Sequence, residues 1–99
     1  MKKNESENLE LLFQGILTLS TMEECREFFG DLCTVTELNE MARRLNAAKM
    51  LTENHVYNTV AEQTGLSTAT ISRVNQCLKY GNGGYRTVLE NLERIARRK

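Results

Sequence analysis

The stretch "YNTVAEQTGLSTATISRVNQ", residues 57–76, decides how this chain folds. It matches the helix-turn-helix pattern, in which two short helices meet at a tight turn. Ala61 falls where the two helices cross closely, Gly65 falls at the left-handed residue of the turn, and Leu66 follows directly. A bulkier residue at position 61 would push the helices apart, and a Cβ at position 65 would strain the turn.

The buried side of this motif is marked by apolar residues. They are Val60, Ile71 and Val74. A polar group at position 71 would be buried without a hydrogen-bonding partner, which is costly. An ordinary corner of two helices obeys the same packing rules, so the motif alone leaves a purely structural role open.

Outside this stretch, apolar residues recur at three- and four-residue spacing, which is typical of amphipathic helices. No segment alternates as a strand does, so we predict an all-α chain. The repeating positions are Leu9, Leu12, Phe13, Ile16 and Leu17; Met22, Cys25, Phe29, Leu32 and Cys33; Leu38, Met41, Ala42, Leu45 and Ala48; and Tyr85, Val88, Leu89, Leu92, Ile95 and Ala96.

Helix starts are indicated by two matches to the capping box, in which a hydroxyl and a carboxylate satisfy each other's free backbone N–H groups. These matches are Ser20 with Glu23 and Thr34 with Glu37. The glycines of "GNGG" at 81–84 interrupt the helical pattern and predict a linker.

We expect a single helical domain over residues 1–99. Long amphipathic helices with few connections often complete their core by dimerising, so a second copy of the chain is the expected partner. The expected parts are dimerisation helices over 9–54, a helix-turn-helix over 55–80, a glycine linker over 81–84 and a C-terminal helix over 85–97.

Charge is unevenly distributed although the net charge is zero. Up to Glu40, three basic residues face nine acidic ones, whereas from Met41 onward ten basic residues face four acidic ones. A basic C-terminal half favours an anionic partner. The acidic half needs no explanation beyond a solvated helix face.

Several classes of protein are disfavoured. No apolar run approaches the ~20 residues that span a bilayer, and no signal peptide is visible, so we expect a cytoplasmic protein without membrane contact. Cys25, Cys33 and Cys77 fit no disulfide or zinc spacing, and His55 is the one histidine beside them, so we expect reduced thiols and no metal. No nucleophile–base pair or phosphate loop is present, so we expect no enzyme.

The second helix of the motif, predicted over 67–79, carries many short hydroxyl side chains. Ser67 is well placed to cap it. A recognition helix enters the major groove of DNA by its N-terminal end, where small residues let the backbone approach base edges. Helix propensity disfavours so many hydroxyl and β-branched residues without a further use. The predicted DNA-binding residues are Asn58, Ser67, Thr68, Ala69, Thr70, Ser72, Arg73, Gln76 and Lys79.

Two segments, "ELNEMARRLNAAKMLTEN" at 37–54 and "STATISRVNQCLKYGNGGY" at 67–85, resemble the Trp repressor family. Within it they look like the Trp-repressor-like YerC/YecD-type branch of Gram-positive bacteria, over about residues 9 to 90. The resemblance implies a Trp-repressor-like intertwined homodimer of about six helices per chain, with two recognition helices about one DNA turn apart. It also implies that the positions matching Thr68, Ala69, Thr70 and Ser72 face the operator, and Lys79 has a matching basic residue.

The same resemblance implies an effector pocket at Arg73, Val74 and Cys77. Arg73 matches the family arginine that stacks on bound indole. Val74 stands where the tryptophan-binding protein has glycine, and Cys77 replaces a serine that helps to hold the amino acid. A valine side chain intrudes on space that glycine leaves open for a flat ring. We therefore expect no cofactor and no L-tryptophan site; a different, unknown small-molecule effector or none remains.

The sequence thus predicts a sequence-specific DNA-binding transcriptional regulator, expected to be a repressor, that reads the major groove of double-stranded DNA with helix 67–79. The alternative is a helical dimer that acts as a protein-interaction or effector-sensing module with weak DNA binding. Sparse charge supports this alternative, because residues 57–80 hold only Arg73 and Lys79 against Glu62.

Overall fold

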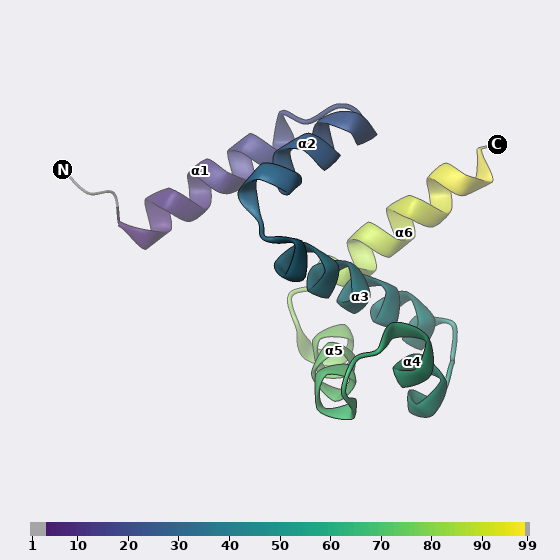
Figure 1. The fold of residues 1–99 in the computed structure, drawn as a ribbon. Coiled ribbons are helices and arrows are strands. Elements are labelled where there is room, and N and C mark those ends of the chain that lie inside the picture. Colours follow the sequence, from purple (N-terminus) through teal and green to yellow (C-terminus); the bar gives the residue numbers. More distant parts are fainter. Residues whose placement is uncertain (1–3, 99) are drawn as a thin grey trace. The chain divides into compact units, whose positions relative to one another are not determined.

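A computed structural model describes residues 4–98 of the chain. They form six α-helices and no strand (Figure 1). The prediction of an all-α fold with about six helices is confirmed. None of the helices described for residues 4–98 is both long enough and apolar enough to span a membrane. The helices are α1 (Glu5–Leu17), α2 (Met22–Leu32), α3 (Val35–Thr52), α4 (Tyr57–Thr64), α5 (Thr68–Tyr80) and α6 (Gly84–Arg97).

The helices belong to two compact units that divide between Leu38 and Asn39. The first unit holds α1 and α2, and the second holds most of α3 together with α4, α5 and α6. The single helical domain expected over residues 1–99 stays a prediction; residues 1–3 and 99 of that range lie outside the described residues.

The start of α2 differs from the predicted one by one residue. Its capping box joins Thr21 and Glu24, whose backbone N–H donates to the Thr21 hydroxyl at 3.1 Å. The predicted pair of Ser20 and Glu23 is therefore wrong. The two pairs have the same spacing, but the Glu24 carboxylate accepts hydrogen bonds from two backbone N–H groups, those of Ser20 at 2.8 Å and Thr21 at 3.1 Å. Satisfying both free donors favours the later start.

The capping box predicted for the third helix is confirmed. The backbone N–H of Thr34 donates to the Glu37 carboxylate at 2.8 Å, and the N–H of Glu37 donates to the Thr34 hydroxyl at 3.1 Å. The bond from the Thr34 backbone, and then the contact with its hydroxyl, lower the pKa of Glu37. The cap is therefore fully formed above the usual pKa of glutamate and is lost as the pH falls through the lowered value.

The core of the second unit forms where α4 and α5 pack against α3. Ala47 and Ala48 of α3 have no exposed surface, so the side chains around them cover them completely. The buried residues form two clusters, of which one joins Ala47, Met50, Val60, Leu66 and Ile71, and the other joins Ala48, Val74 and Leu78.

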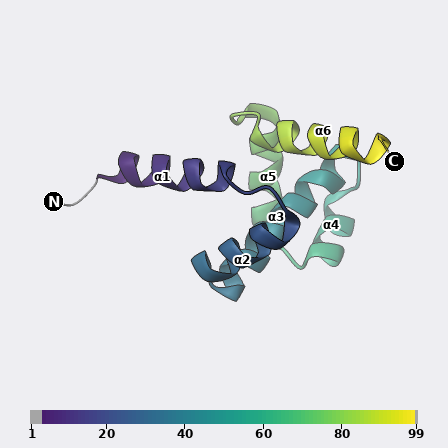
Figure 2. The same cartoon turned by 90° about the horizontal axis from the view of Figure 1, so that it is seen from above.

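The glycine segment at 81–84 is a tight turn between α5 and α6 (Figure 2). Gly81 closes α5 by donating its N–H to the Cys77 carbonyl at 2.9 Å. A Cβ at position 81 would lie 2.5 Å from that carbonyl oxygen, so only glycine fits there. Gly83 adopts a left-handed φ of 83° directly before α6. The predicted linker therefore has a specific conformation, and α6 begins inside it, at Gly84.

The core assignment can be tested at Val60. We expect Val60→Ala to lower the free energy of unfolding by about 2–3 kcal/mol, because it removes buried methyl groups and leaves a cavity. Urea denaturation followed by circular dichroism measures this change. Val56→Ala is the matched control, since Val56 precedes the same helix with 66% of its surface exposed. It should cost less than about 0.5 kcal/mol. Equal costs for the two variants would contradict the assignment.

Candidate nucleic-acid interface

The turn between α4 and α5 is built around Gly65. This residue has a φ of 75°, and its N–H donates to the Ala61 carbonyl at 2.9 Å. A left-handed φ strains residues that carry a Cβ, which explains the glycine. Leu66 follows with 6% of its surface exposed and joins the core. The left-handed Gly65 is confirmed, and so is the predicted burial of Val60, Ile71 and Val74.

Thr64 supports this turn and was not identified from the sequence. Within residues 4–98 it is the one buried polar residue, at 7% exposure. Its hydroxyl donates to the Val60 carbonyl at 2.7 Å and accepts from the Leu66 N–H at 3.2 Å. One side chain thus links the last turn of α4 to the start of the next segment. A hydroxyl directly before the glycine of the turn was the available signal.

Ser67 caps α5. Its side-chain oxygen accepts the backbone N–H of Thr70 at 3.1 Å and donates to the Thr70 hydroxyl at 3.1 Å. The cap satisfies one of the free N–H groups at the helix start. The hydroxyl of the half-buried Thr70 thus takes part in the cap.

The two faces of α5 have different surroundings. Ile71, Val74 and Leu78 point into the core with at most 7% exposure. On the outer side, Ala69, Ser72, Arg73 and Gln76 follow the spacing of a single helix face and are exposed. The other exposed residues of the predicted set are Asn58, which lies on α4, Ser67, Thr68 and Lys79.

The outer face of α5 is weakly basic. Arg73 and Lys79 are the charged residues of the helix, which carries no carboxylate. Within the described part of the chain, neither forms a salt bridge. Both cations are therefore free to meet an anionic partner such as phosphate.

The residues of the predicted effector pocket lie in different surroundings. Val74 has 2% exposure and packs with Ala48 of α3 and Leu78. Arg73 is exposed, and Cys77 is a half-buried free thiol. The valine side chain thus fills core space beneath α5 instead of lining an open pocket.

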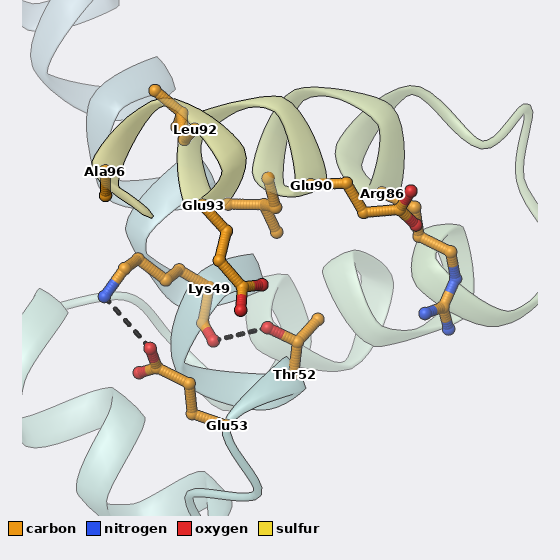
Figure 3. A pocket seen from close by; sticks show the side chains of 9 residues that line it. Lys49, Thr52, Glu53, Arg86, Glu90, Leu92, Glu93 and Ala96 are labelled. Carbon is orange, nitrogen blue, oxygen red and sulfur yellow. Dashed lines mark hydrogen bonds and ion pairs between the residues drawn. The ribbon is translucent and has the colours of Figure 1, made fainter. Parts of the chain in front are cut away.

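A groove lies elsewhere in the second unit, between the end of α3 and α6 (Figure 3). It contains charges of both signs, and the Lys49 ammonium lies 3.0 Å from the Glu53 carboxylate. None of the predicted site residues lines it. Within residues 4–98, no group of three His, Cys, Asp or Glu side chains could hold a metal ion. The lining residues are Lys49, Thr52, Glu53, Arg86, Leu89, Glu90, Leu92, Glu93 and Ala96.

Comparisons with known proteins agree on one family. The sequence pattern of the Trp repressor protein family matches residues 7–93. The uncharacterized protein YerC of Bacillus subtilis is 46% identical over 91 residues, which cover 92% of this chain and 88% of YerC. A crystal structure of a TrpR-like protein from Eubacterium eligens has a TM-score of 0.85 and 48% identity, and the match covers 90% of this chain and 92% of that one. A crystal structure described as that of a "putative Trp repressor" from Staphylococcus aureus has a TM-score of 0.84 and 45% identity. That match covers 88% of this chain and 87% of the Staphylococcus aureus chain. The chain therefore belongs to the Trp repressor family.

Proposed function

We propose that this protein is a sequence-specific DNA-binding transcriptional regulator that reads the major groove with α5. The observation that carries the proposal is the outer face of α5, where Thr68, Ala69 and Ser72 are small and exposed above a buried apolar face. Trp repressor family proteins are typically regulators without enzymatic activity, which agrees with this reading. We place the protein in the cytoplasm and assign it the role of a repressor.

Recognition follows from the chemistry of these side chains. Short residues at the N-terminal end of α5 let its backbone come close to base edges, and the methyl groups of Thr68 and Ala69 suit the thymine methyl. Hydroxyl groups bond bases, phosphates or bridging water. Arg73 and Lys79 supply phosphate contacts, and Asn58 supplies a polar contact from the preceding helix.

We further propose that the protein acts as an intertwined homodimer. Two helices support this because they expose apolar faces in the single chain. On α6, Val88, Leu92 and Ile95 are 45%, 50% and 54% exposed. On α1, Leu9 and Phe13 are each 52% exposed. A second copy would cover such surfaces, and a two-fold dimer would place two α5 helices on half-sites about one DNA turn apart.

The alternative function is a protein-interaction or effector-sensing module with weak DNA binding. The small number of cations on α5, two, favours it. The two functions differ in their response to salt, because phosphate contacts release counterions and a module with weak DNA binding makes few of them. A steep fall in duplex affinity with rising salt supports the regulator.

The exposed outer face of α5, which is the proposed reading face, can be tested at the neighbouring Thr70. We expect Thr70→Asp to weaken binding to a duplex selected by the wild-type protein at least about tenfold, because it adds a negative charge beside the exposed Ala69 and Ser72, where phosphates would repel it. An acidic residue in the first turn of α5 favours the helix itself, so the protein should stay folded. Fluorescence anisotropy measures the affinity.

Thr36→Asp is the matched control for this variant. Thr36 is exposed in the first turn of α3, so the change adds the same charge near the start of another helix, outside the proposed reading face. Its DNA affinity should stay within about twofold of the wild type. The assignment of the reading face fails if the two variants bind equally well.

The absence of a tryptophan effector is a separate prediction. Because Val74 is packed into the core beside Ala48, we expect calorimetry with L-tryptophan to show no heat of binding. The affinity for the selected duplex should also be the same with and without the amino acid. Micromolar binding of L-tryptophan would overturn this view of Val74.

A further inference from the structure

The C-terminal end of α5 is held by a residue of the next helix. The last carbonyl groups of a helix have no partner within it. In α5, the Cys77 carbonyl accepts the N–H of Gly81, and the Leu78 carbonyl accepts the Nε–H of Arg86 at 3.0 Å in a partly buried hydrogen bond. Arg86 also places a positive charge near the negative end of the α5 dipole.

Two further constraints act on the same joint. The Gly81 N–H, bonded to the Cys77 carbonyl at 2.9 Å, and the Thr87 N–H, bonded to the Gly83 carbonyl at 3.0 Å, tie the backbone at the two ends of the turn. Tyr85 and Leu89 of α6 pack against the cluster that contains Val74 and Leu78. The α5–α6 joint is therefore held by its backbone, by apolar packing and by the Arg86 hydrogen bond.

The joint connects two surfaces with different proposed roles. One is the outer face of α5, and the other is the exposed apolar face of α6 formed by Val88, Leu92 and Ile95. The guanidinium of Arg86 lies at one end of the α3–α6 groove, away from the ion pair of Lys49 and Glu53 at the other (Figure 3). Its Nε–H is thus directed to α5 and not into that ion pair.

We propose that Arg86 is a positioning residue that fixes the angle between the reading helix and the dimer face. This proposal rests on the proposed function. Arg86 touches no base; it acts through the Leu78 carbonyl. A fixed angle makes a dimer sensitive to the distance between its two half-sites, because neither α5 helix can tilt to follow a shifted groove.

Two variants separate the hydrogen bond from the bulk of the side chain. The Nε2 of glutamine is the same number of bonds from the backbone as the Nε of arginine, so Arg86→Gln keeps a donor at that place without the charge. The terminal methyl of methionine occupies the same place without a donor, so Arg86→Met removes the bond. Arg94→Met is the control, because Arg94 is an exposed residue of the same helix whose side chain contacts Asn91.

The first measurement compares affinities for two duplexes. One is selected from a random library by the wild-type protein, and the other has one base pair added between its half-sites. We expect the wild type, Arg86→Gln and Arg94→Met to discriminate strongly between them. Arg86→Met should lose discrimination by about fivefold, the factor that one net hydrogen bond is worth. A general loss of protein stability would weaken binding to both duplexes by the same factor and leave the discrimination unchanged. Unchanged discrimination in Arg86→Met therefore overturns the proposal.

The second measurement needs no DNA. Amide hydrogen exchange in the free dimer should be at least about fivefold faster at Gly81 in Arg86→Met than in the wild type and Arg86→Gln, with exchange in α4 unchanged. We call the Arg86 hydrogen bond to the Leu78 carbonyl the Arg86 tether. Unchanged exchange at Gly81 would contradict the claim that this tether holds the end of α5. If the wild type selects no duplex while Gly81 responds as expected, the proposed function fails and the tether stands.

Discussion

The contact between α3 and the α4–α5 pair is the constraint on which the rest of the second unit depends. Ala47 and Ala48 have no exposed surface, and each belongs to one of the two core clusters. Larger side chains there would lift the helix pair away from α3 and open both clusters, because protein interiors tolerate little added volume. The buried face of α5 is decided by this contact, and its outward face follows from it.

The outward face of α5 combines small side chains with little charge. Two cations per helix give few phosphate contacts, whereas a two-fold dimer doubles them along with the base contacts. Dimerisation and DNA reading are thus linked in the proposed function, since each copy alone offers a weak site. The buried Val74 packs against Ala48 of α3, so the chain's own side chain fills the space under α5.

Sequence reasoning reached the features that depend on local chemistry. The glycine of the turn, the Ser67 cap, the Thr34 box and the buried side of α5 all follow from neighbouring residues. The start of α2 was misplaced because two overlapping pairs have the same spacing and only the structure shows which carboxylate meets two donors. The Arg86 tether was missed because its acceptor is a backbone carbonyl eight residues away, which no side-chain pattern reveals. The DNA contacts themselves stay predictions, because they depend on a partner outside the chain.

The structure of the protein bound to a duplex that it has selected would test the central claim most directly. The account predicts two copies of the chain on one duplex, each with the N-terminal half of α5 in the major groove and Thr68 and Ala69 against base edges. DNA held by another surface, such as the α3–α6 groove, with α5 facing solvent, would contradict it.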